Sequence, residues 1–376
     1  MFKRIISIAA SAAVVAGVLI AAPAQAAGTP INGAGSSFAN NAMQACLSAY
    51  QTNTTTYLST GSGTGKAWFK GTITDADRDK YGALNVKSSY DFAATDSFYT
   101  ATDKPAFDFV TVPLLGGPIA FTYTASRVAD GLNLTAQNIS DIFTGRVTKW
   151  NDASIKQNNM KLILPNKDIK VFYRSGSSGT NENISNYLAQ NLPGQGWVKS
   201  STWSTAINGA LPSGRTSPVG TGLGTSSLLA QTLEDTLNGF GYFDLSDAIT
   251  ADVSIAKLQN KAGAFIAPTA SAAAKFLNAQ SIVSSNNDWD NGTVAIDFTK
   301  NVSGAYQLSI LTYGVAPRFT PSASAKVSTD AKKLAVGDFF KYVVASCIPA
   351  KAASLGYVAL GGALKTSALN QIKKIG

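Results

Sequence analysis

Hydroxyl, glycine and charged residues gather in four short stretches of this chain. They lie at 33–38, 61–65, 92–96 and 174–180. Three of them precede helix-like segments, where free backbone N–H groups and the positive end of the helix dipole favour an anion. Arg174 adds a fixed charge that can hold an oxyanion through two parallel hydrogen bonds. Together the stretches predict one anion-binding site.

Asp96 narrows the kind of anion that this site can accept. A carboxylate repels a fully ionised anion, but it accepts a hydrogen bond from an anion that still carries a proton. Phosphate carries one at neutral pH and sulfate does not. A site built in this way can discriminate by about 10⁴–10⁵. We therefore expect Asp96 to select phosphate and Arg174 to balance its charge, with an Asx cap of the next turn as the structural alternative.

Each of the other stretches also has an ordinary structural interpretation. Ser37 is placed to cap a helix while its hydroxyl and the Phe38 N–H face the anion, but a serine cap after a glycine turn is common. The stretch around Ser62 equally fits a hairpin or a flexible turn. The stretch from Arg174 is the sharpest signal, because a strand, a glycine-rich turn and a helix follow in the order of an anion cradle. Arg174 could instead be a salt-bridged strand end.

The elements that must position these stretches alternate between strand and helix patterns, which indicates an α/β fold. The strand-like runs are 108–113, 119–123 and 169–173. The helix-like runs are 39–50, 182–192 and 332–345. The segment 195–224 is rich in Gly, Ser, Thr and Pro and contains Trp197 and Trp203, so we expect a long surface excursion with some local packing.

Paired glycines and prolines at 112–118 interrupt two apolar strands and predict a crossover between two lobes. Segment 305–312 would carry the chain back. We therefore expect a discontinuous lobe I at 27–117 and 306–376, and a continuous lobe II at 118–305. The ligand is expected in the cleft between the lobes.

The first 26 residues have the pattern of an export signal. Lys3 and Arg4 precede an apolar run at 5–22, and Ala24-Gln25-Ala26 fits a small-x-small cleavage rule. An uncleaved membrane anchor is the alternative. Because no later apolar run approaches the length of a membrane span, we expect a soluble mature chain in the periplasm, with further secretion left open.

Composition excludes several classes of function. The chain has no histidine and two cysteines, so we expect no zinc or copper site and no histidine-based triad. A binding role needs no catalytic residue and no cofactor, and we expect neither. The formal net charge is +9, and removal of Lys3 and Arg4 leaves +7. Such a field attracts small anions. The basic residues are too scattered to predict nucleic-acid binding.

Cys46 and Cys347 each lie in an amphipathic, helix-like stretch. An oxidising compartment permits their pairing, which would tie the first helix to the last. Two buried free thiols are the alternative.

The four stretches, in this order, resemble the phosphate-binding protein of the bacterial phosphate ABC transporter, a type II periplasmic binding protein. Segments 142–152 and 355–360 are similar to further signatures of that family. Segment 31–33 and the Ser-Ser-Gly-Thr form of the arginine loop look closest to the DING-type branch, whose members bind phosphate.

The resemblance implies a two-lobe fold, a monomer, and delivery of inorganic phosphate to a membrane permease without cofactor or metal. Carried onto this chain, it assigns phosphate binding to eight residues: Ser37, Phe38, Ser62, Asp96, Arg174, Ser178, Gly179 and Thr180. An extracellular DING-like phosphatase and a secreted adhesion or matrix protein are the alternatives.

One departure from the family pattern concerns the arginine. Family members usually carry an acidic residue two positions after it, whereas this chain has Gly176. Arg174 is therefore expected to be less neutralised or to find another partner, such as Glu182.

Overall fold

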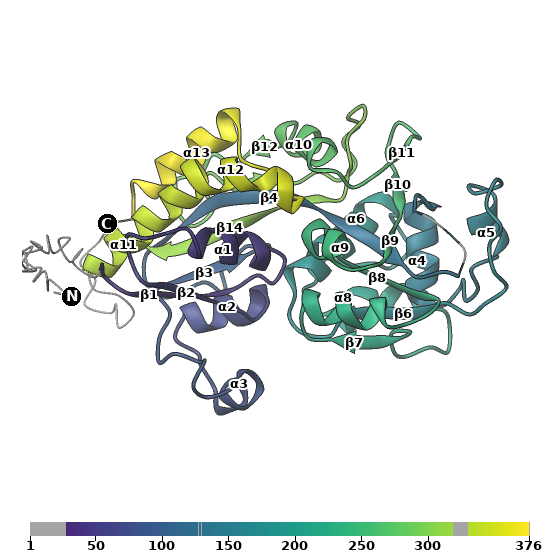
Figure 1. The fold of residues 1–376 in the computed structure, drawn as a ribbon, viewed down its shortest axis with the longest axis horizontal. Coiled ribbons are helices and arrows are strands. Elements are labelled where there is room, and N and C mark those ends of the chain that lie inside the picture. Colours follow the sequence, from purple (N-terminus) through teal and green to yellow (C-terminus); the bar gives the residue numbers. More distant parts are fainter. Residues whose placement is uncertain (1–27, 127, 129, 319–329, 376) are drawn as a thin grey trace, which may run out of the picture.

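The computed structural model describes residues 28–126, 128, 130–318 and 330–375. The predicted export signal at 1–26 lies outside these residues. Figure 1 shows an α/β fold with two groups of elements side by side. The first lobe, as we use the term, contains β1–β3, β14, α1–α3 and α11–α13, and the second lobe contains β6–β8 and α4–α9. The predicted lobe bounds stay a prediction.

One nine-stranded sheet runs through both lobes. Its order is β2 (Thr55–Ser59), β1 (Ile31–Gly35), β3 (Phe92–Thr95), β14 (Ser309–Pro317), β4 (Phe109–Tyr123), β8 (Gly239–Asp244), β6 (Lys170–Arg174) and β7 (Thr221–Leu223), with β9 (Ser254–Ile255) paired to β4. Two small sheets comprise β5 (Asn133–Leu134) with β10 (Lys257–Gln259) and β11 (Phe265–Ile266), and β12 (Ser281–Ile282) with β13 (Val294–Ala295).

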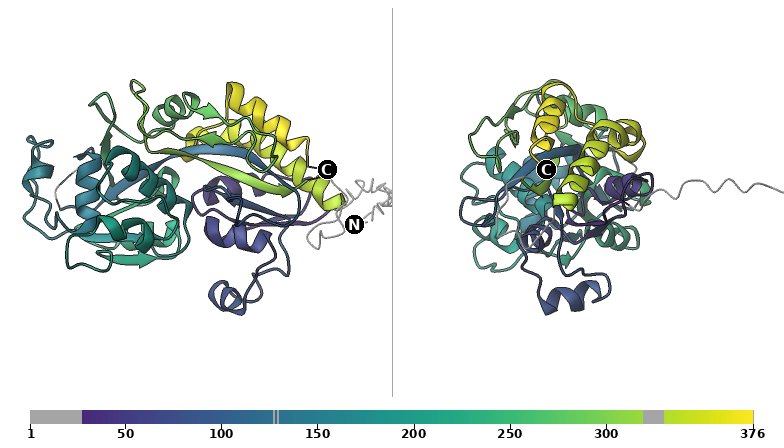
Figure 2. Two further views of the ribbon diagram at one scale, coloured as in Figure 1. Left: turned by 180° about the vertical axis from the view of Figure 1, so that it is seen from behind. Right: turned by 90° about the vertical axis from the view of Figure 1, so that its left-hand side faces the viewer.

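Helices cover this sheet in both lobes. In the first lobe, α2 packs on β1 and β3 while α13 packs on β4, and α11–α13 lie together on one side (Figures 1 and 2). Outside the second lobe, the helices are α1 (Asn40–Leu47), α2 (Ser62–Phe69), α3 (Asp75–Tyr81), α10 (Ala270–Asn278), α11 (Asp330–Tyr342), α12 (Ile348–Leu355) and α13 (Gly362–Ile372). Those of the second lobe are α4 (Ala136–Thr144), α5 (Ala153–Lys156), α6 (Gly179–Asn191), α7 (Trp203–Ile207), α8 (Ser226–Glu234) and α9 (Leu245–Thr250).

The segment predicted as a crossover is not an interruption between two strands. Residues 109–123 form the single strand β4, which is buried along its whole length. β4 pairs with β14 up to Pro118 and with β8 from Ile119. Pro118 thus lies where the partner changes, and Pro113 lies next to a register shift, two places where a missing N–H is tolerated. The chain therefore passes from the first lobe to the second within β4, which pairs with β14 in the first lobe and with β8 in the second.

The segment 195–224 has the predicted local packing, but it also contains regular elements and is not only a surface excursion. It contains α7, a short 3₁₀ turn at Asn208–Ala210 and the edge strand β7. Trp197 and Trp203 are buried, and their rings pack at 5.8 Å between centroids. The two tryptophans anchor the segment to the core, which its glycines and prolines do not reveal.

The structure joins Cys46 of α1 to Cys347, which ends the π-helical turn Val343–Cys347 between α11 and α12. This is the first of the two arrangements that the sequence leaves open, although Cys347 precedes α12 and does not lie in the last helix, α13. The bond links residues 301 positions apart. It fixes the helix that begins at the candidate site to the C-terminal helices.

Reduction of this disulfide should lower the free energy of unfolding by about 2–5 kcal/mol, because the open chain gains conformational entropy when unfolded. Denaturant midpoints with and without a thiol reductant measure the change. A variant with both Cys46→Ala and Cys347→Ala serves as the control and should not respond to the reductant. Equal midpoints for the reduced and oxidised wild type would show that the bond contributes nothing.

Candidate anion-binding site

The four predicted stretches meet where strands end and helices begin. β1, β2 and β3 run parallel and end at one edge of the sheet, where they lead into α1, α2 and Asp96. β6 of the second lobe leads into α6 in the same way. Close approach at this edge depends on Gly35, since a Cβ there would lie 2.0 Å from the carbonyl oxygen of Ala94.

Free backbone donors mark the starts of α1, α2 and α6. Among the described residues, the N–H groups of Phe38, Ser62, Gly179 and Thr180 donate no hydrogen bond. These are the unsatisfied N–H groups of helix N-termini, which bind anions through hydrogen bonds and the helix dipole. All four had been predicted, and their binding of phosphate stays a prediction.

Ser37 does not cap α1 as expected. The N-cap position is Ala39, and the Ser36 hydroxyl accepts from the Ala39 N–H at 3.2 Å. Ser37 instead accepts from Arg174 Nη1 at 2.6 Å. The α1 helix begins later than its apolar pattern suggests, so the Ser37 hydroxyl is directed to the second lobe. Ser178, by contrast, is the N-cap of α6, and its hydroxyl accepts from Asn181 N.

Asp96 follows β3, as predicted, and its carboxylate is surrounded by hydroxyl groups. It accepts from Ser36 Oγ at 2.7 Å, from Ser62 Oγ at 3.1 Å and from Thr312 Oγ1 at 2.6 Å. Burial raises the pKa of Asp96, while the three hydroxyls and Arg174 act in the opposite direction. Hydroxyl groups can rotate their protons, so this cluster can accept as well as donate.

Arg174 is buried, with 1% of its surface exposed, and none of the described carboxylates lies within ion-pair distance of it. Its guanidinium donates to the Gly224 carbonyl through Nε at 3.1 Å and Nη2 at 2.6 Å. Nη1 also donates to Ser226 Oγ at 3.2 Å. A buried cation without a carboxylate partner is costly, so this position is suited to an anionic ligand.

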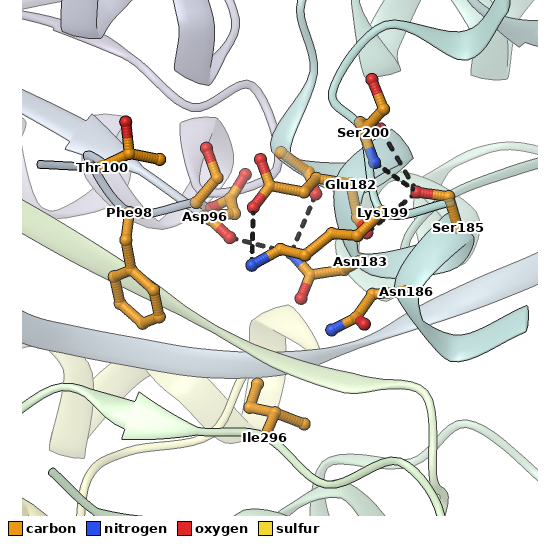
Figure 3. Close-up of polar contacts among 12 residues, drawn as sticks. Asp96, Phe98, Thr100, Glu182, Asn183, Ser185, Asn186, Lys199, Ser200 and Ile296 are labelled. Carbon is orange, nitrogen blue, oxygen red and sulfur yellow. Dashed lines mark hydrogen bonds and ion pairs between the residues drawn. The ribbon is translucent and has the colours of Figure 1, made fainter. Parts of the chain in front are cut away.

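Glu182 is not the partner of Arg174. It forms an ion pair with Lys199 at 3.2 Å, and Figure 3 shows Lys199 extending over α6 toward it. The same view shows Asn183 of α6 donating across the lobes to the carbonyl oxygen of Asp96, at 2.8 Å. A cavity of 380 Å³ borders these residues between the lobes, next to Asp96. Helical spacing could not show that Glu182 faces this cavity.

The lobes touch directly at the candidate site. Gly63 N donates to the Ser177 carbonyl at 3.1 Å. A Cβ built on Gly179 would lie 2.6 Å from Ser62 Oγ and 2.7 Å from Asp96 Cβ. The start of α6 therefore packs against the start of α2 and against Asp96, and both halves of the site come together.

Five residues that form hydrogen bonds with Asp96 or Arg174 were not among the predicted site residues. They are Ser36, Asn183, Gly224, Ser226 and Thr312. Ser36 adjoins a predicted residue and Asn183 lies one helical turn after Gly179, so both had a local signal. Gly224, Ser226 and Thr312 had none, because tertiary folding brings them in. The described residues contain no group of three or more acidic, histidine or cysteine side chains that could hold a metal ion.

Comparison with known proteins places this architecture in a family. The model of a family described as the PBP superfamily domain matches residues 21–345. The phosphate-binding protein PstS of Xylella fastidiosa is 27% identical over 321 residues, which cover 83% of this chain and 76% of that protein. PstS2 of Mycobacterium bovis is 28% identical over 299 residues, covering 78% and 75%.

A solved structure supports the fold. It is a high-affinity periplasmic phosphate-binding protein, PfluDING, bound with phosphate. It aligns with a TM-score of 0.68 at 22% identity and covers 90% of this chain and 92% of its own. The predicted two-lobe α/β fold is confirmed. None of the described helices has both the length and the hydrophobicity needed to span a membrane.

Proposed function

This chain belongs to the family described as the PBP superfamily domain, and we propose that it is a solute-binding protein that captures inorganic phosphate between its lobes. The observation that carries the proposal is the buried Arg174, which has none of the described carboxylates within ion-pair distance and donates to Ser37 before the start of α1. The PstS relatives, named as phosphate-binding proteins, support the choice of ligand.

Each group in the site has a distinct task in this proposal. The free N–H groups of Phe38, Ser62, Gly179 and Thr180 and the hydroxyls of Ser37 and Ser178 donate to the phosphate oxygens. Arg174 supplies the positive charge. Asp96 accepts a hydrogen bond from the protonated oxygen of phosphate, and this selects against an anion that has no proton to donate.

We also propose that the protein is an exported monomer that presents phosphate to the membrane permease of an ABC transporter. A periplasmic location agrees with the signal-like sequence at 1–26 and with the oxidised cysteine pair. The positive net charge would draw phosphate toward the lobes.

We propose binding without catalysis, since the site groups donate or accept hydrogen bonds and none is an evident activated nucleophile. The proposal is tested by incubating the mature protein with labelled phosphate and, separately, with a phosphomonoester. We expect one phosphate retained per chain and no turnover. Turnover that Asp96→Asn or Arg174→Ala abolishes would replace the binding role with that of a phosphatase.

Replacing Gly179 with alanine should weaken phosphate binding by about 5- to 150-fold, because the new methyl group would overlap Ser62 and Asp96 and hold the lobes apart. Gly176→Ala is the matched control, since a Cβ at Gly176 has nothing within 4 Å. Calorimetric affinities of both variants measure the effect. Equal affinities would mean that the lobes do not close at Gly179 around phosphate.

A further inference from the structure

Two buried aspartates lie at the start of α9 in the second lobe. Asp244 ends β8 and caps α9, where its Oδ1 accepts from the Asp247 N–H at 3.0 Å. Asp244 is 0% exposed and Asp247 is 8% exposed. The cap contact and the position of Asp247 in the first turn of α9 therefore place the two residues next to each other.

Each of these carboxyl groups has one oxygen that accepts no hydrogen bond within the part of the chain that the structure describes. In both residues this oxygen is Oδ2, and it is buried. Two neighbouring carboxylates that are both ionised and buried repel each other. Here their Oδ2 atoms would also lack donors among the described residues. One proton shared between them removes the repulsion and satisfies the unpaired oxygens. Aspartate pairs in protease active sites share a proton for the same reason.

The pair holds the first lobe at the edge of the phosphate site. Asn41 of α1 donates to Asp247 Oδ1 at 2.8 Å and to Ser246 Oγ at 3.2 Å. The Tyr357 hydroxyl lies 2.7 Å from the Phe38 carbonyl and 3.2 Å from Asp244 Oδ1, and it donates to both with a single proton. Phe38 is also a proposed phosphate donor, so these contacts connect the pair to the site.

We infer that Asp244 and Asp247 share one proton when the lobes are closed, and that this proton couples closure over phosphate to pH. The inference rests on the proposed function, because it concerns the closure that captures phosphate. Separation of the lobes would break the contacts to Asn41 and Tyr357 and admit water to both carboxyl groups. The open pair would then ionise and release the proton.

The surrounding charges agree with this assignment. Burial raises the pKa of Asp244 well above its usual value, and the charge of Asp247 adds to this effect. Burial also raises the pKa of Asp247, while hydrogen bonds from neighbouring groups and the positive charge of Arg174 oppose it. Arg174 on β6 and Tyr357 after α12 are the charged and titratable neighbours that act on the pair.

The direction of the pH effect follows from linkage. The closed form binds the shared proton more tightly than the open form, so closure takes up a proton. The contribution of this pair to phosphate affinity is therefore fully present below the ordinary aspartate pKa and is lost as pH rises through the raised value. Because one proton is taken up, phosphate affinity can change through this pair by at most about tenfold per pH unit.

Asp247→Asn tests the inference with little change in shape. The amide oxygen can still accept from Asn41, and the amide N–H₂ stands where the shared proton would be, so Asp244 can stay ionised. Calorimetric titration of phosphate in buffers of different ionisation enthalpy counts the protons taken up on binding. We expect wild type to take up as much as about one proton more than this variant, since phosphate contributes equally to both.

Asp252→Asn is the matched control, because Asp252 is exposed at the end of the same region, and it should keep the wild-type proton count. Asp244→Asn should lose the additional proton as Asp247→Asn does. If Asp244→Asn fails to fold, Asp247→Asn decides. Should Asp247→Asn also fail to fold, infrared spectroscopy of the phosphate-bound protein replaces the titration. A band of a protonated carboxyl group in wild type that is retained in Asp96→Asn supports the inference. The absence of this band overturns it.

Phosphate binding with equal proton counts in wild type and both variants would overturn the inference and leave the proposed function intact. Absence of phosphate binding by wild type would overturn the proposed function itself. The two failures are therefore distinguishable in one set of titrations.

Discussion

Replacing Arg174 with alanine is expected to weaken phosphate binding by about 2–5 kcal/mol, which corresponds to about 30- to 5,000-fold in Kd. Arg174 is the buried positive charge of the site, and no described carboxylate neutralises it within ion-pair distance. An anion bound beside it would gain charge-assisted hydrogen bonds in a site from which water is excluded. Calorimetric titration of the variant with phosphate measures the loss.

Two companion variants separate charge from geometry. Arg174→Lys keeps the charge but loses the guanidinium fork that holds the Gly224 carbonyl, so its affinity should fall between wild type and alanine. Arg215→Ala removes an exposed arginine of the same lobe and should bind as wild type does. Melting curves establish that each variant is folded. Unchanged affinity in folded Arg174→Ala would remove Arg174 from the site.

Replacing Asp96 with asparagine should narrow the preference for phosphate over sulfate by about 10- to 150-fold, the range expected when a charged hydrogen bond is lost or an ionic repulsion is relieved. An ionised Asp96 accepts a hydrogen bond from the phosphate O–H and repels sulfate. The amide N–H₂ of asparagine can instead donate to either anion. Titrations with both anions at neutral pH measure the ratio. Asp79→Asn, at an exposed position of the first lobe, is the control. An unchanged ratio would show that Asp96 does not select the ligand.

The same selectivity should depend on pH. Burial raises the pKa of Asp96, so its carboxylate protonates at higher pH than an ordinary aspartate. Protonated Asp96 no longer repels sulfate and can donate to it. Sulfate binding should therefore strengthen as pH falls toward this raised pKa, by at most about tenfold per pH unit. Asp96→Asn should lose this dependence.

The fold could be predicted from sequence to the level of its elements. β6 and α6 match the strand and helix expected around Arg174, since apolar periodicity and a glycine-rich turn mark their boundary locally. β4 was predicted as two strands, because Pro113, Pro118 and two glycines between them are typical of interruptions. A strand that changes partner tolerates these prolines, and which strand pairs with it is not a local property.

The candidate site could be predicted in part, for a related reason. Helix starts reveal their free N–H groups through serine and glycine, so Phe38, Ser62, Gly179 and Thr180 could be found from the sequence. Thr312 bonds to Asp96 only because β14 pairs with β3, over a separation of 216 residues. Gly224 contributes a carbonyl oxygen, which every residue has. No sequence motif marks such a contact.

The most direct test of the central claim is calorimetric titration of the mature protein, stripped of bound anion, with phosphate and then with sulfate at neutral pH. We predict tight binding of one phosphate per chain and no heat of binding for sulfate. Equal binding of the two anions, or no binding of phosphate, would contradict the account, because the helix N-termini, Arg174 and Asp96 would then not form a phosphate site.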